Sequence, residues 1–107
     1  MATYDLYGFP LDDMNEAKKL LENVFCIEFE IHDSSYQNGD YFKCGNATRE
    51  HFVLKRNLDP FDGESAELLF TEYPILLYVN DTSRSADLQT LIVQKAKKFV
   101  LLRHEEL

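Results

Sequence analysis

Residues 74–79 read PILLYV, the longest apolar run in this 107-residue chain. An apolar run without polar alternation is typical of a strand that is buried on both faces at the centre of a sheet. The run is far too short to cross a bilayer, because a spanning helix needs about 20 apolar residues. The stretch therefore predicts the central strand of a globular domain, and we expect no membrane partner.

Two helices are predicted on either side of this strand. Asp13 followed by Glu16 has the spacing of a capping box, and apolar residues recur at helical spacing from Met14 to Phe25. We therefore expect a helix over residues 13–25. A second apolar stripe predicts a helix after the turn at residues 80–83, with the members Ala86, Leu88, Leu91, Ile92, Ala96 and Phe99.

The remaining segments read as strands. Residues 27–32 (IEFEIH) alternate strictly, which predicts that Ile27, Phe29 and Ile31 face the core while the polar residues face water. Residues 104–107 read as a tail after the last strand. The other predicted strands are Thr3–Tyr7, Asp40–Cys44, Glu50–Asn57 and Val100–Arg103.

The order of these elements predicts the fold class. The chain reads β-α-β-β-β-β-α-β, and its length fits a single domain over residues 1–107. We expect an α+β fold in which about six mostly antiparallel strands form one sheet with both helices on one face. The specific prediction is a split β-α-β, or ferredoxin-like, arrangement with an extra hairpin.

Negative charge is concentrated around the central strand. The net charge is −8, and residues 59–81 carry six carboxylates without any Lys or Arg. Such a surface repels nucleic acid and attracts basic proteins. Pro60 and Gly63 predict an exposed loop over residues 59–65. We therefore predict a partner-binding surface made of Asp59, Asp62, Glu64, Glu67, Glu72 and Tyr73.

The predicted meander carries a cluster of positive charge. Basic and aromatic residues interleave there as they do in platforms that bind single-stranded nucleic acid. The preferred interpretation is that these bases balance the acids of the first helix and of the 59–81 block, so we expect no nucleic acid partner. The residues concerned are Lys43, Arg49, Lys55 and Arg56 with Tyr41, Phe42 and Phe52.

The sequence offers no catalytic constellation. Its four glycines are not spaced as a phosphate-binding loop, and Cys26 and Cys44 are expected to be buried free thiols. Glu28, Glu30 and His32 on one strand face could hold a divalent cation, although such residues usually just face solvent. We expect no enzyme activity, no metal and no cofactor. The N-terminus lacks the features of a secretory signal, which predicts a cytoplasmic protein.

Three segments carry a resemblance to a known class of proteins. They are GDYFK at residues 39–43, FVLKRN at residues 52–57 and EYPILLYVN at residues 72–80. Through these and its small acidic α+β plan, the chain resembles immunity proteins of bacterial polymorphic toxin systems of the contact-dependent growth inhibition kind. The resemblance implies an inhibitor that binds one cognate toxin domain, frequently a basic nuclease, and plugs its active site or covers a neighbouring surface.

Two other interpretations stay open at this level. One is a small ligand-binding or enzymatic domain that completes its site by dimerisation, with a pocket lined by aromatic residues such as Tyr4, Phe29 and Tyr78. The other is an adaptor module unrelated to toxins. The sequence does not decide the oligomeric state.

Overall fold

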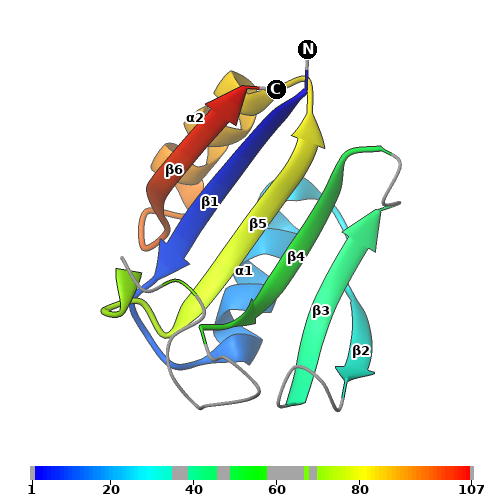
Figure 1. The fold of residues 1–107 in the computed structure, drawn as a ribbon, viewed down its shortest axis with the longest axis vertical. Helices are drawn as coiled ribbons and strands as arrows, with labels where there is room; N and C mark the ends of the chain where they lie inside the picture. The colour runs from blue at the N-terminus through cyan, green and yellow to red at the C-terminus, as the bar shows by residue number, and fades with distance from the viewer. Residues whose placement is uncertain (1, 35–38, 46–48, 58–66, 68–69, 107) are drawn as a thin grey trace.

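The computed structural model describes residues 2–34, 39–45, 49–57, 67 and 70–106. They form an α+β domain in which both helices cover one face of a six-stranded sheet (Figure 1). The elements follow the predicted order. They are β1 (Thr3–Phe9), α1 (Met14–Phe25), β2 (Glu30–Ser34), β3 (Gly39–Gly45), β4 (His51–Arg56), β5 (Ile75–Thr82), α2 (Ser85–Lys95) and β6 (Val100–Glu106).

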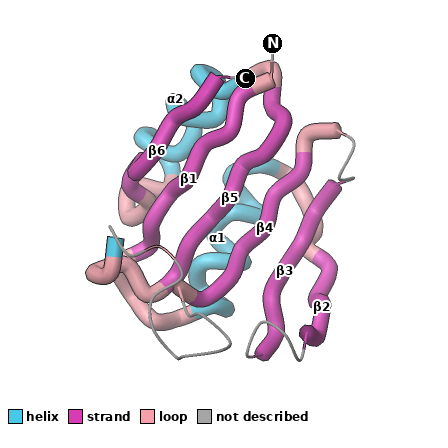
Figure 2. The backbone as a smooth tube through the Cα atoms, in the orientation of Figure 1, coloured by secondary structure: helices cyan, strands magenta, loops and turns pink. Residues whose placement is uncertain are grey.

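The sheet confirms the predicted split arrangement. Its strand order is β2-β3-β4-β5-β1-β6, and every neighbouring pair is antiparallel. β5 lies between β1 and β4, and β1 lies between β5 and β6, so neither helix connects two adjacent strands (Figure 2). The strands β2 and β3 form the extra hairpin at one edge of this plan.

Burial places β1 and β5 at the centre of the domain. Leu76, Leu77 and Val79 of β5 are fully buried, as the apolar run predicts. Tyr7 of β1 and Leu77 belong to the core between sheet and helices, while Leu6 is buried on the opposite face. A strand that is covered on both faces gains from apolar residues at every position, which explains why this sequence does not alternate.

The helices begin and end for local chemical reasons. The Asp13 carboxylate accepts a hydrogen bond of 3.0 Å from the Glu16 backbone N–H, which caps α1 as predicted. α2 ends at Lys95, so Ala96 and Phe99 are buried after the helix and not within it. Ala86 is exposed, which corrects its predicted place on the buried stripe.

The second strand starts later than predicted, and one of its apolar residues is exposed. β2 begins at Glu30, because the Glu22 carboxylate accepts the Phe29 backbone N–H at 2.9 Å and holds the preceding residues close to α1. Phe29 is buried, but the prediction for Ile31 is wrong, since 62 % of this residue is exposed. β2 is an edge strand, and alternation alone does not say how far the helices extend over an edge.

The predicted tail is part of the sheet. β6 continues to Glu106, and its last four residues, 103–106, pair with residues 3–6 of β1. Their polar sequence hides the strand from periodicity because an edge strand needs little apolar surface. Within the described part of the chain, neither helix has the length and apolar character required to cross a membrane.

Replacing Leu77 by alanine should strongly destabilise the fold. Its side chain is fully buried in the core, so Leu77→Ala should lower the free energy of unfolding by about 2–5 kcal/mol in a urea titration. Val93→Ala, at a residue that is 68 % exposed on α2, is the control and should change it by less than about 0.5 kcal/mol. Equal effects of the two substitutions would contradict the assignment of the core.

Candidate functional site

The structure describes three of the six residues predicted to bind a partner. Glu67, Glu72 and Tyr73 lie between the end of β4 and the start of β5, whereas Asp59, Asp62 and Glu64 lie outside the described residues. Glu72 is exposed and Tyr73 is half-buried. Asp81, the last carboxylate of the acidic block, belongs to the far end of β5, so the strand separates it from the other acids.

The side chain of the buried residue Asn57 links the two ends of residues 58–66, which we call the acidic segment. The base of this segment is Asn57 together with Glu67 and residues 70–74. Asn57 Nδ2 donates to the carbonyl oxygens of Phe70 and Tyr73 at 3.0 Å each, and its Oδ1 accepts the Glu67 backbone N–H at 2.8 Å. The Asn57 backbone N–H also donates to the carbonyl of Pro74 at 2.9 Å. The chain therefore enters residues 58–66 at Asn57 and leaves them at Glu67, two residues that are hydrogen bonded to each other. We call these contacts the Asn57 clamp.

The carboxylate of Glu67 is engaged within the chain. It accepts a hydrogen bond of 2.9 Å from the Tyr78 hydroxyl and faces the Arg103 guanidinium at 3.4 Å. Burial raises the pKa of the Tyr78 hydroxyl, and the bond to Glu67 adds to the shift. The Arg103 Nε lies 3.2 Å from Glu105. Glu67 therefore attaches the base of the acidic segment to the sheet, and its carboxylate forms an ion pair with Arg103 of β6.

Tyr73 fixes the same base by packing. A Cβ atom placed on Gly8 would lie 2.5 Å from the Tyr73 ring and 2.9 Å from Leu102. Only glycine leaves space for that ring over the centre of β1. Tyr73 is therefore in the first place a packing residue that covers the sheet face opposite the helices.

One base of the meander is placed as the balancing interpretation predicts. Arg56 forms an ion pair with Asp12, just before α1. Phe42 and Phe52 are buried in the core on the helix side, so they cannot stack with a ligand on the opposite face. Lys55 Nζ lies 5.8 Å from the centre of the Tyr78 ring, which makes a cation–π contact. The basic and aromatic residues of the meander are therefore divided between the two faces of the sheet, which does not fit a single stacking platform.

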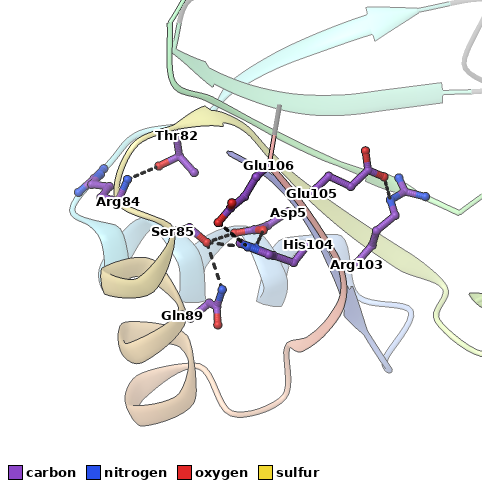
Figure 3. Close-up of polar contacts among 9 residues, drawn as sticks. All are labelled: Asp5, Thr82, Arg84, Ser85, Gln89, Arg103, His104, Glu105 and Glu106. Carbon is purple, nitrogen blue, oxygen red and sulfur yellow. Dashed lines mark hydrogen bonds and ion pairs between the residues drawn. The ribbon is translucent and has the colours of Figure 1, made fainter. Parts of the chain in front are cut away.

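A buried carboxylate joins the two ends of the chain, a feature that the sequence prediction missed. Asp5 of β1 accepts hydrogen bonds of 2.6 Å from Ser85 at the start of α2 and from His104 Nδ1 of β6 (Figure 3). Gln89 Nε2 donates to Ser85 Oγ at 3.1 Å. The Asp5 side chain has no exposed surface. The sequence signal that could have revealed this cluster is a charged aspartate between the apolar residues Tyr4 and Leu6 of a short predicted strand.

These side chains do not have the arrangement of a hydrolytic triad. In a triad the nucleophile lies at one imidazole nitrogen and the carboxylate lies at the other. Here Ser85 donates to the same carboxylate that binds His104 Nδ1, and the other nitrogen, Nε2, lies 3.7 Å from Glu106. The cluster ties β1, α2 and β6 together and does not prepare Ser85 for attack.

The described residues contain no group of three potential metal ligands. Glu28 precedes β2 and is not on the strand with Glu30, and the His32 side chain lies outside the described residues. Both cysteines are free thiols as expected, but Cys26 is exposed at the left-handed cap of α1, which corrects its predicted burial. Cys44 is partly buried, and burial raises the pKa of its thiol.

A shallow hollow of about 210 Å³ lies on the sheet face opposite the helices. Tyr4 and Tyr78 line it as the ligand-binding alternative expects. Phe29 does not, because it packs in the core against Phe42 with ring centres 6.4 Å apart. The lining residues are Tyr4, Asp5, Leu6, Tyr78, Asn80, Arg103 and Glu105.

No protein-family model matches this sequence, and no curated protein matches it. The functional assignment therefore depends on the side chains themselves. Among the described residues, the most extensively bonded surface feature beside the Asp5 cluster is the base of the acidic segment.

Removing the Asn57 side chain should loosen this base. Asn57→Ala removes three hydrogen bonds to backbone groups, so it should lower the free energy of unfolding by about 3 kcal/mol, at roughly 1 kcal/mol for each bond. Chemical denaturation measures the change. Asn15→Ala, at an exposed position of α1, is the control and should stay within about 0.5 kcal/mol. A small effect at Asn57 would show that the clamp does not stabilise the fold.

The His104 contact predicts a pH dependence of stability. The hydrogen bond from His104 to Asp5 raises the pKa of the imidazole above its usual value near 6.5. The stabilisation from this contact is complete at pH values below the pKa of the histidine in the unfolded chain. It is lost as pH rises through the higher pKa of the folded protein. His104→Gln should therefore destabilise the protein more at pH about 5.5 than at pH about 8.5. Unfolding titrations at both pH values measure this difference.

The same substitution at His51 is the matched control. The His51 ring contacts the Arg49 carbonyl at 2.7 Å and has no carboxylate partner among the described residues. His51→Gln should therefore give no comparable dependence on pH. An effect of His104→Gln that is equal at both pH values would contradict the assigned role of the imidazolium.

Proposed function

We propose that this chain is an immunity protein of a bacterial toxin system of the contact-dependent growth inhibition kind. It binds a cognate basic toxin domain, such as a nuclease, and neutralises it by occupying its surface without turning over a substrate. The partner-binding residues are the carboxylates Asp59, Asp62, Glu64 and Glu72, while Glu67 and Tyr73 attach the chain that follows residues 58–66 to the sheet.

The Asn57 clamp is the observation that carries this proposal. It joins residues 57 and 67 directly, so the segment between them is closed at its base. Binding costs less conformational entropy when the binding segment is held in place before the partner arrives. A clamp made by a buried side chain with three bonds fits a segment that must be presented to a partner.

Charge supports a basic partner. Residues 58–66 contain three carboxylates and no Lys or Arg, so nothing inside the segment neutralises them. Acids elsewhere in the domain have bases close by, as Glu50 pairs with Arg84 at 2.9 Å and Glu16 pairs with Lys98 at 3.2 Å. A run of carboxylates without Lys or Arg in the sequence attracts a positively charged surface and accelerates its association. On a nuclease they would occupy the place of substrate phosphates.

The proposal predicts that a secreted effector is encoded beside this chain, and the C-terminal domain of that effector is the partner to test. The purified proteins should form a complex in size-exclusion chromatography, and the chain should protect cells that produce the toxin domain. Absence of both the complex and the protection would overturn the proposed function.

Neutralising the segment should slow association. A variant with Asp59→Asn, Asp62→Asn and Glu64→Gln should reduce the association rate constant at low ionic strength by about tenfold or more and flatten its dependence on salt. Stopped-flow or surface-based kinetics measure both quantities. The sequence predicts an exposed loop over residues 59–65, and exposed charges contribute little to stability, so the fold should be retained.

The matched control changes the same amount of charge elsewhere. It combines Glu28→Gln, Asp81→Asn and Asp87→Asn, which lie outside this segment before β2, at the end of β5 and on α2. This control should have a smaller effect on the rate, of the size expected from net charge alone. Equal effects of the two triple variants would show that the partner responds to overall charge and not to residues 59–64.

A further inference from the structure

The hollow on the sheet face opposite the helices is formed by the three strands β5, β1 and β6. The pairing of β1 with β5 shifts register between Thr3 and Asp5, and the pairing of β1 with β6 shifts between Leu6 and Tyr7. Bulges of this kind redirect side chains and are frequent beside binding sites. Both register shifts flank residues that line the hollow, and these residues belong to β1, β5 and β6, which lie side by side in Figure 1.

The backbone is strained at the edge of this feature. Asp81 has a positive φ of 54°, a left-handed conformation that is uncommon for residues other than glycine. It follows Asn80, whose side chain lines the hollow. Strain that persists in a folded domain often accompanies a binding role. The end of β5 therefore departs at Asp81 from the backbone conformation of a regular strand.

The chemistry of the lining suits a planar cation. Tyr4 and Tyr78 supply aromatic rings, Leu6 supplies an apolar floor, and Asn80 and Glu105 supply acceptors. Aromatic rings and carboxylates together bind guanidinium groups through cation–π contacts and paired hydrogen bonds. The volume of about 210 Å³ would hold about seven water molecules, which is room for one side chain.

Groups of the same kinds already bind two cations of the domain itself, Arg103 and Lys55. All three guanidinium nitrogens of Arg103 face carboxylates, with Glu67 at 3.4 Å and Glu105 at 3.2 Å. Lys55 lies over the Tyr78 ring. The same kinds of groups that would meet a ligand therefore bind cations within the chain.

The balance of charge disfavours an anion. Two carboxylates, Glu105 in the lining and Glu67 beside it, lie next to the single guanidinium of Arg103, whereas the carboxylate of the lining residue Asp5 is buried on the helix side. An anion would meet Glu105 at once and would compete with carboxylates for Arg103. The net charge of −8 adds to this preference.

The geometry points to a recognition site for an arginine side chain of the protein partner in the hollow formed by Tyr4, Tyr78, Asn80 and Glu105. The assignment of that arginine to a toxin rests on the proposed function, but the chemistry of the site does not. The hollow and the base of the acidic segment share Tyr78, so one partner could contact both.

The site is tested without the toxin by nuclear magnetic resonance. N-acetyl-L-arginine methylamide should shift the signals of Tyr4, Tyr78 and Asn80 with a dissociation constant on the order of 1–10 mM, as expected for a small fragment. Glu105→Gln should weaken this binding by about threefold or more, because it removes a charged acceptor. Tyr4→Leu, which removes a ring and keeps an apolar side chain, should weaken it as well.

The adjacent residue provides the control. Glu106→Gln makes the same change on β6, but Glu106 lies on the helix side next to His104 and should leave the binding unchanged. Stronger shifts with N-acetyl-L-glutamate methylamide, equal effects of the two glutamine variants, or no shifts around the hollow would each overturn the site.

The toxin complex then separates the two proposals. If the complex forms, Glu105→Gln should raise its dissociation rate more than Glu106→Gln does. If the fragment binds in the hollow but the toxin domain forms no complex, the proposed function fails while the cation site stands. If the complex forms and neither variant changes its dissociation, the partner's arginine does not enter the hollow.

Discussion

The pairing of β1 on both of its sides constrains the whole domain. Its partners, β5 and β6, come from the second half of the chain, so the first strand can complete its hydrogen bonds only when the last strand is in place. This requirement buries Asp5 between the two chain ends, where Ser85 and His104 must supply its hydrogen bonds. A buried carboxylate without such partners would be costly, so the cluster specifies how β6 and α2 meet β1.

The same central strands organise the opposite face. Gly8 leaves space for Tyr73, and Tyr78 and Arg103 receive the carboxylate of Glu67, so the segment after β4 is attached across three strands. Charges that look equivalent in the sequence therefore have different roles. Glu67 is bonded to Tyr78 and Arg103, Asp81 lies at the far end of β5, and it is to the carboxylates between Asn57 and Glu67 that we assign the proposed contact with a partner.

The prediction from sequence agrees with the structure where a segment has a strong periodic pattern. The apolar run of β5 and the capped helix α1 have strong local patterns, and both elements lie where they were predicted. Ile31 and the polar residues 104–106 were misjudged because both belong to edge strands, where the cover provided by helices and neighbours sets exposure. The Asn57 clamp was not predicted either, since one asparagine at the end of a strand has no pattern of its own.

The sequence by itself determined the α+β class, the order of the elements, the central strand and the excess of negative charge. These properties depend on local periodicity and composition, which a single chain displays directly. Only the tertiary structure decided which acids are bonded internally, that Asp5 meets His104 across 99 positions, and that two tyrosines border one hollow. Such contacts depend on strand register and bulges, and these are fixed only when all the strands pack together.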